Sequence, residues 1–217
     1  MTTLWKIAAT LLAVVFLVMA FVLYSVWWQP RPTDTTDTRI FDGDPYAVDY
    51  CAKVQLDGSG LTADDIPKAY TPHCGFDQWP MPILADCTEP LAPGAEDLRG
   101  LWQVVDGLEG HIERVEQCGD RVIVVGSNFI HDFRTTGDLA DGANDINPRN
   151  CMRIRAAIHW DADKTLVFRA FDLFDVVSRR LEDADTMMWD YGPAETVSRL
   201  KRLCRLPPVR LSQARLP

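Results

Sequence analysis

Residues Leu98–Arg134, with the sequence LRGLWQVVDGLEGHIERVEQCGDRVIVVGSNFIHDFR, decide the fold. Four short runs rich in apolar, often β-branched residues are separated by glycine-containing turns. The runs are Gly100–Val105, His111–Gln117, Arg121–Val125 and Phe129–Arg134. Runs of this length, separated by such turns, are typical of strands joined as hairpins. The stretch therefore predicts four consecutive antiparallel strands.

The same pattern continues toward the C-terminus. Five further strands are predicted, at Met152–Trp160, Thr165–Ala170, Val176–Leu181, Thr186–Tyr191 and Thr196–Leu203. About nine short strands joined mainly by tight turns indicate a mainly β fold, and an up-and-down antiparallel barrel over residues 98–206 would remove the exposed sheet edges.

Residues 135–150 separate the two groups of strands, and we expect an irregular loop there. The loop contains Asp138, Asp141 and Asp145, and carboxylates are ligands that calcium prefers. Their spacing does not follow the order of an EF-hand loop, so a solvated acidic loop is the better interpretation. No metal site is expected.

The N-terminal segment is a long apolar run. Ile7–Trp28 contains no charged side chain, and a helix of that length at about 1.5 Å per residue crosses about 30 Å of hydrocarbon. A cleaved signal peptide would have a shorter apolar core, about 7–15 residues. We therefore predict a transmembrane helix at residues 7–28. Lys6 on its N-terminal side keeps residues 1–6 in the cytoplasm and places the rest in the periplasm or outside the cell.

Residues 29–38 are rich in Pro, Thr and Asp, which is typical of a linker. We expect residues 39–97 to form an extension packed on the barrel, and residues 207–217 to form a loose tail. All six cysteines follow the apolar run: Cys51, Cys74, Cys87, Cys118, Cys151 and Cys204. An even number of cysteines beyond a membrane segment suggests an oxidising compartment and up to three disulfides that brace the extension. Six cysteines allow fifteen pairings, and the sequence does not choose among them.

The charge distribution bears on partners. The net charge is -9, and a nucleic-acid partner would require a basic surface. The stretch Arg31–Arg99 carries thirteen acidic against five basic residues, so the acidic excess belongs to the linker and extension. A solvated surface explains this excess, and docking of a basic envelope protein is the alternative.

Gly100-Leu101-Trp102 on the first barrel strand, together with arginines on the last strand, resembles the lipocalin or calycin superfamily. The resemblance implies that Gly100 and Trp102 close one end of the barrel and that Arg199 or Arg202 packs across the tryptophan. Separately, the run 112–122 with Ile130-His131-Asp132 is similar to a group of uncharacterised exported bacterial proteins.

A lipocalin-like barrel has room inside for side chains or for one small ligand. The predicted inner face carries His131 and six apolar residues: Phe129, Phe133, Ile158, Trp160, Phe168 and Trp189. These residues either fill a core or line a pocket for a small apolar or amphipathic ligand.

Three functions follow from this arrangement: a membrane-anchored ligand-binding barrel, an envelope interaction module with a filled barrel, or an enzyme that uses His131. His131 could also be a purely structural residue. The sequence contains no recognised catalytic motif, and no cofactor is expected.

Overall fold

The computed structural model describes residues 2–27, 43–72, 76, 78–126, 129–147, 152–192 and 196–206. The chain forms two compact units, Met1–Thr33 and Asp34–Pro217. The first unit contains α1 (Thr2–Trp27), which confirms the predicted N-terminal helix, although the helix begins five residues before Ile7. Within it, Trp5–Tyr24 has a mean hydropathy of 2.7 and is long and apolar enough to cross a membrane.

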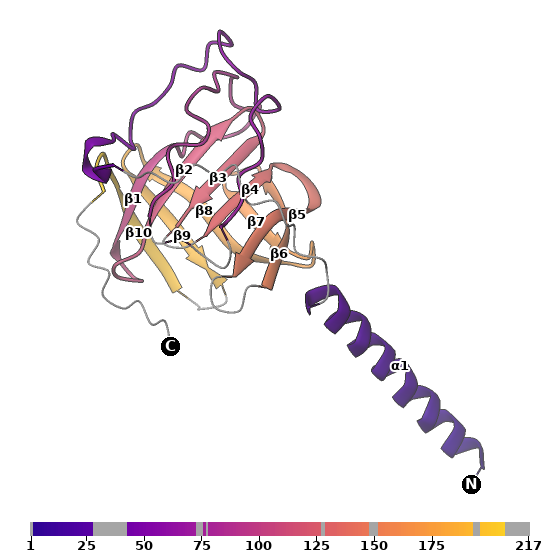
Figure 1. The fold of residues 1–217 in the computed structure, drawn as a ribbon. Helices are drawn as coiled ribbons and strands as arrows, with labels where there is room; N and C mark the ends of the chain where they lie inside the picture. The colour runs from indigo at the N-terminus through magenta and orange to yellow at the C-terminus, as the bar shows by residue number, and fades with distance from the viewer. Residues whose placement is uncertain are drawn as a thin grey trace. The chain divides into compact units, whose positions relative to one another are not determined.

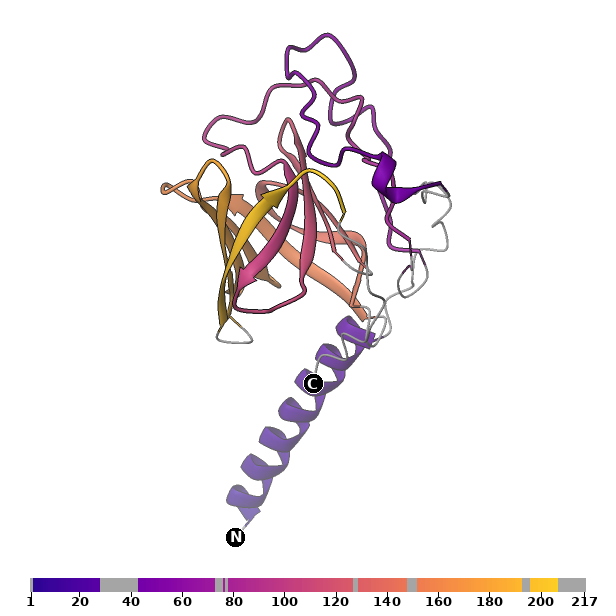
Figure 2. The ribbon, with the colours of Figure 1, turned by 90° about the vertical axis from the view of Figure 1, so that its left-hand side faces the viewer.

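The second unit is built on one sheet of ten antiparallel strands that curves around an interior (Figures 1 and 2). The strands are β1 (Gly100–Asp106), β2 (Ile112–Cys118), β3 (Arg121–Val125), β4 (Ile130–Arg134), β5 (Thr136–Asn147), β6 (Met152–Trp160), β7 (Leu166–Ala170), β8 (Phe174–Asp183), β9 (Thr186–Tyr191) and β10 (Thr196–Leu203). The predicted mainly β, up-and-down barrel is confirmed.

The strand order is β4-β3-β2-β1-β10-β9-β8-β7-β6-β5. Every strand pairs with its neighbour in sequence, apart from β4 and β5, and the first strand also pairs with the last. The two ends of the sheet are β4 and β5, which follow each other in the chain through Thr135. The barrel is therefore nearly closed, with its seam between β4 and β5.

The prediction of an irregular loop at residues 135–150 was wrong for most of its length. Thr136–Asn147 forms β5, the longest strand, and pairs with β6. The pairing shifts register between Thr136 and Leu139 and again between Asp141 and Ile146. Such bulges break the two-residue alternation that identifies a strand in a sequence.

The sheet separates two apolar cores. The inner core lies within the barrel and includes Trp102, Phe133, Ile158, Phe168 and Met187. The outer core lies between the sheet and the extension, whose described residues form loops, turns and the short 3₁₀ helix Pro45–Ala47. It joins Tyr50, Trp79 and Leu84 of the extension to outward-facing residues of β1, β3 and β4, namely Leu101, Ile123, Val125 and Ile130.

A disulfide between Cys87 and Cys118 ties the extension to the end of β2. It supplies one of the braces expected from the cysteine count. Cys51 and Cys204 are free thiols in the structure. Cys74 and Cys151 lie outside the described residues.

Candidate functional site

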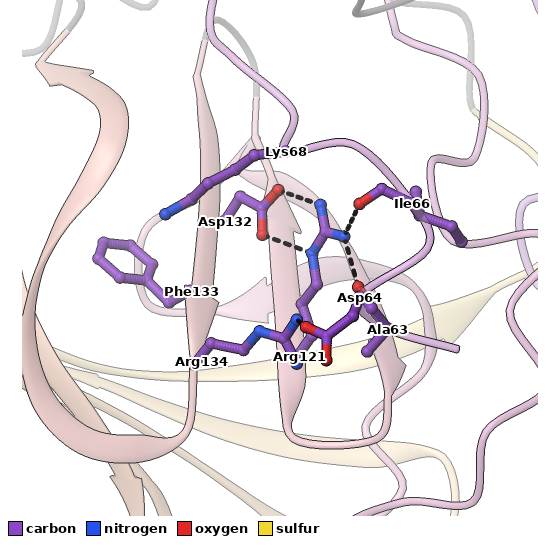
Figure 3. A pocket seen from close by; sticks show the side chains of 8 residues that line it. All are labelled: Ala63, Asp64, Ile66, Lys68, Arg121, Asp132, Phe133 and Arg134. Carbon is purple, nitrogen blue, oxygen red and sulfur yellow. Dashed lines mark hydrogen bonds and ion pairs between the residues drawn. The ribbon is translucent and has the colours of Figure 1, made fainter. Parts of the chain in front are cut away.

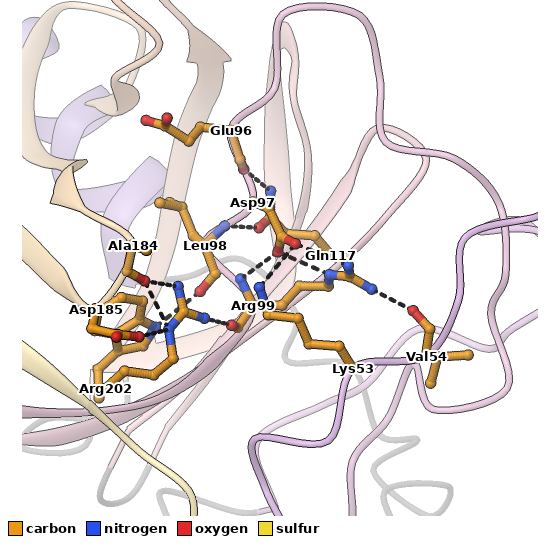
Figure 4. Close-up of polar contacts among 11 residues, drawn as sticks. Lys53, Val54, Glu96, Asp97, Leu98, Arg99, Gln117, Ala184, Asp185 and Arg202 are labelled. Atoms are coloured by element: carbon orange, nitrogen blue, oxygen red, sulfur yellow. Dashed lines mark hydrogen bonds and ion pairs between the residues drawn. The ribbon is translucent and has the colours of Figure 1, made fainter.

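A tryptophan and an arginine pack together at one end of the barrel. The guanidinium carbon of Arg202 lies 4.2 Å from the centroid of the Trp102 ring, and the Trp102 Nε1–H donates to the carbonyl of Leu98 at 2.9 Å. The Arg202 guanidinium also donates to the carbonyls of Arg99 and Ala184 (Figure 4). Of the two arginines that the resemblance left open, Arg202 is the one that packs on Trp102, and its role in closing the barrel stays a prediction.

Arg199 does not take the closing role. It pairs with Glu182 at 3.0 Å, and both side chains are substantially exposed. The reason is strand parity: Trp102 is the register partner of Arg202, whereas Arg199 is an odd number of residues away and points to the other face of β10.

The predicted ligand-binding residues share the inner face of the barrel. Trp102 on β1 pairs with Glu113 on β2, and following the register from strand to strand assigns every inward position. The inward set includes His131, Phe133, Ile158, Trp160, Phe168 and Trp189. Phe129 joins them at the start of β4, with its ring centroid 4.4 Å from that of His131. Whether these residues bind a ligand stays a prediction.

His131 lies half-buried among aromatic rings. Its ring centroid is 6.3 Å from that of Phe133 and 6.4 Å from that of Phe168. Its neighbour Asp132 faces outward, where it accepts two hydrogen bonds from Arg121 at 2.9 and 2.6 Å. The two residues therefore do not form an acid–base dyad, and the enzyme hypothesis gains no carboxylate partner from Asp132.

The barrel interior also holds charged groups that the sequence reading missed. Glu113 on β2 and Arg179 on β8 are both fully or almost fully buried, and they form an ion pair with N–O distances of 2.7 and 2.8 Å. The second oxygen of Glu113 also lies 3.2 Å from Nε2 of His111. Burial alone would raise the pKa of Glu113, but the charge and hydrogen bonds of Arg179 outweigh it and lower that pKa well below its usual range.

Aromatic rings surround this ion pair. The Arg179 guanidinium carbon lies 5.2 Å from the ring centroid of Phe168 and 5.7 Å from that of Trp189. His111 stacks on Trp189, with centroids 4.4 Å apart. Trp189 is only 7% exposed, yet its Nε1–H has no hydrogen-bond partner within the described part of the chain. Buried polar groups are almost always paired, so this donor is a position where a bound molecule can supply an acceptor.

The interior is less tightly covered at the end of the barrel that carries His111 and Tyr191. Inner-facing residues there are half-buried rather than buried: His111, Phe129, His131, Val177 and Tyr191. At the opposite end, Trp102, Met187 and Leu200 are fully buried. The inner-facing side chains around Trp102 are therefore buried, those at the other end are partly exposed to solvent, and the ion pair lies between the two zones.

A cleft lies outside the barrel, where the extension meets β3 and β4 (Figure 3). Its volume is about 110 Å³, and its lining includes Lys68, Arg121, Asp132, Phe133 and Arg134. The guanidinium of Arg121 is committed to Asp132 and to the carbonyls of Ala63, Ile66 and Pro67. The residues that line this cleft fasten the extension to the sheet. Because their polar groups are already used in this way, the barrel interior is the better candidate for a binding site.

A comparison with protein-family models finds no match for this chain, and a comparison with curated proteins finds none either. The class that the geometry defines is a nearly closed, ten-stranded antiparallel barrel, compatible with a lipocalin-like fold, on a chain with one N-terminal apolar helix.

Proposed function

We propose that this protein is a membrane-anchored, extracytoplasmic barrel that binds one small amphipathic molecule in its interior. The observation that carries the proposal is the Nε1–H of Trp189, which has no hydrogen-bond partner among the described residues and is buried near the aromatic side chains at the partly exposed end of the barrel. An unpaired buried donor costs about 1–3 kcal/mol, and a ligand with an acceptor would recover that cost.

The surrounding residues define the chemistry of the ligand. Phe133, Ile158 and Phe168 offer an apolar surface, which favours a hydrocarbon or aromatic body. The charge of Arg179 is already balanced by Glu113, so the site does not require an anionic head group. A neutral oxygen acceptor such as a hydroxyl, ester or amide carbonyl satisfies the Trp189 donor without disturbing the ion pair.

The test begins with native mass spectrometry of the full chain, looking for a small molecule that copurifies at one copy per chain. Binding is then measured on protein in nanodiscs with three probes of equal chain length: a twelve-carbon alkane, alcohol and carboxylate. We expect the alcohol to bind more tightly than the alkane. Equal affinity for the alcohol and the alkane would contradict a role for the Trp189 donor.

Trp189→Phe keeps an aromatic ring, although a smaller one, and removes the donor. This variant should weaken binding of the alcohol by about 5–10-fold, the value of one neutral hydrogen bond, and leave the alkane unchanged. Trp79→Phe is the matched control, because Trp79 is also buried but belongs to the outer core beside Tyr50. Equal losses for both variants would indicate a general packing effect instead of a binding site.

The location rests on the apolar helix and on the cysteines. The helix is long enough to span a bilayer, and Lys6 favours a cytoplasmic N-terminus. Protease added to intact spheroplasts should digest the barrel after mild denaturation while sparing a tag placed at the N-terminus. Protection of the barrel together with digestion of the tag would reverse the orientation.

An envelope interaction module remains the second candidate, and one surface favours it. The turn between β7 and β8 exposes Phe171, Leu173 and Phe174, the last two at 72% and 56%. Phe171 and Asp172 both adopt positive φ, 51° and 57°, which is an unusual conformation for a phenylalanine. Leu173→Ser with Phe174→Ser should abolish function in cells without affecting probe binding if this candidate is right, whereas Trp189→Phe should do the reverse.

A further inference from the structure

Cys51 and Cys204 come together from opposite ends of the second unit. Their sulfur atoms lie within 4.8 Å of each other, and each also lies within 4.8 Å of a carboxylate oxygen of Asp49. Cys51 is half-buried near the start of the extension, whereas Cys204 is exposed directly after β10. Both are free thiols in the structure.

Buried neighbours fix the backbone on both sides of this contact. Tyr50 and Leu206 are 4% and 2% exposed, and both pack in the outer core. The amide of Cys51 donates to the Asp49 carboxylate at 2.9 Å. The two thiols are therefore held near each other by elements that do not depend on a bond between them.

Polar contacts next to Cys51 hold the same segment against the closed end of the barrel. Arg99 donates to the carbonyl of Val54 at 2.8 Å, and Lys53 pairs with Asp97 at 3.0 Å (Figure 4). Arg202, two residues before Cys204, donates to the carbonyl of Arg99. The residues around both cysteines thus meet at one place, near Arg99.

We propose that Cys51 and Cys204 form a second disulfide, which fastens the beginning of the extension to the end of β10. The inference rests on the proposed extracytoplasmic location, because the oxidant would be the disulfide of a thiol oxidoreductase or of a small-molecule disulfide. The exposed thiolate of Cys204 attacks that disulfide and displaces one thiol. The Cys51 thiol then loses its proton as its sulfur attacks the Cys204 sulfur, and the second thiol is displaced.

In this sequence the two cysteines together lose two protons and two electrons, and the oxidant becomes a dithiol, if it is an oxidoreductase, or two thiol molecules. Because burial raises the pKa of Cys51 to about 12, its thiol stays protonated in the reduced protein, and Cys204 is the cysteine that reacts first.

A metal ion is the competing occupant of this cluster. The described residues supply three donors, Asp49, Cys51 and Cys204, while a structural zinc site uses four protein ligands. Metal binding also requires both thiols to stay deprotonated in the bound state, whereas disulfide formation requires Cys51 to lose its proton only during the exchange step. The disulfide needs only the closer approach of two sulfur atoms that already lie within 4.8 Å of each other.

The experiment is a peptide map of the full chain, purified from cells in detergent after blocking free thiols with N-ethylmaleimide. Digestion without reductant should give a peptide that contains Cys51 linked to one that contains Cys204. Cys87–Cys118 is the internal control for the compartment. If Cys87–Cys118 is oxidised while Cys51 and Cys204 are alkylated, the disulfide proposal fails although the location stands. If both pairs are alkylated, the location fails as well.

Serine variants provide a second measurement. Cys51→Ser and Cys204→Ser should each release one additional reactive thiol compared with the wild type, and the double variant should release none. The double variant should also lower Tm by roughly 5 °C or more, because it opens a loop that encloses the whole barrel. Stoichiometric zinc in the wild type that disappears in either single variant would overturn the proposal in favour of a metal site.

Discussion

Glu113 on β2 and Arg179 on β8 meet across the inside of the barrel, where the carboxylate accepts two hydrogen bonds from the guanidinium. Neither residue has appreciable contact with solvent. Removing two charges from water is costly, and a buried pair of this kind contributes little net stability compared with apolar residues of similar volume. The pair lies between the buried and the partly exposed residues of the barrel interior. It therefore forms the inner boundary of the proposed binding site.

Breaking the pair should be far more damaging than replacing it. Glu113→Gln leaves the Arg179 charge buried without a counter-charge, and we expect it to lower the free energy of unfolding by about 3 kcal/mol. The double variant Glu113→Leu with Arg179→Met should recover most of that loss. Denaturant unfolding followed by tryptophan fluorescence measures both effects, with the exposed Glu109→Gln as the control. A double variant as unstable as the single one would show that the pair stabilises the fold outright.

The same pair predicts a dependence of stability on pH. The pKa of Glu113 is lower in the folded protein than in the unfolded chain, where a glutamate titrates near 4.3. Its contribution is therefore fully present above that value and is lost as the pH falls toward the folded pKa. The stability difference between wild type and Glu113→Gln should be constant from pH 8 to about 5 and shrink below about 4.5. A difference that grows at low pH would contradict the assignment.

The packing of Arg202 on Trp102 requires a residue without a side chain at Gly100. Its φ is +145°, and a Cβ there would lie 2.9 Å from the Arg202 guanidinium nitrogen Nη1. Gly100→Ala should lower the free energy of unfolding by about 2–4 kcal/mol through backbone strain and collision with Arg202. Gly94→Ala is the control, because Gly94 has a positive φ of +87° but open space around it, and it should cost about 1 kcal/mol.

The collision can be separated from the strain. In an Arg202→Ala background, Gly100→Ala should cost no more than Gly94→Ala does. A cost for Gly100→Ala that is unaffected by Arg202→Ala would attribute the whole effect to the backbone.

The inward aromatic residues could be predicted because strand alternation is a local signal. The parity of Phe129, His131 and Phe133 is visible in five residues of sequence, and the pairing of β3 with β4 agrees with it. The bulged strand β5 was missed because two register shifts interrupt that alternation. Local patterns therefore identify the regular strands and lose the irregular one.

The ion pair could not be predicted in this way. A glutamate or arginine on a strand is usually solvent-facing, and the partner of Glu113 lies 66 residues away. The one signal available was parity, because Glu113 alternates with Val115 on the face that becomes the interior. The disulfide Cys87–Cys118 was also undetermined, since cysteine spacing alone does not fix which segments meet.

The extension is held to the sheet by buried arginines, and Arg121 provides the clearest test. Its guanidinium, which is almost fully buried, bonds Asp132 and the carbonyls of Ala63, Ile66 and Pro67. Arg121→Met removes these bonds and leaves the Asp132 carboxylate buried beside an apolar chain. We expect hydrogen exchange at residues 63–71 to accelerate at least 10-fold, while exchange in β8 and β9 stays unchanged.

Arg134→Met is the matched control for this joint. Arg134 also forms ion pairs with the extension and the adjoining turn, through Asp64 and Asp120, but its side chain is 35% exposed. Exposed pairs contribute about 0–1 kcal/mol, so exchange at residues 63–71 should change less than about 5-fold. If Arg121→Met accelerates exchange equally throughout the barrel, the extension and the sheet unfold as one cooperative unit, and Arg121 does not act as a local clamp.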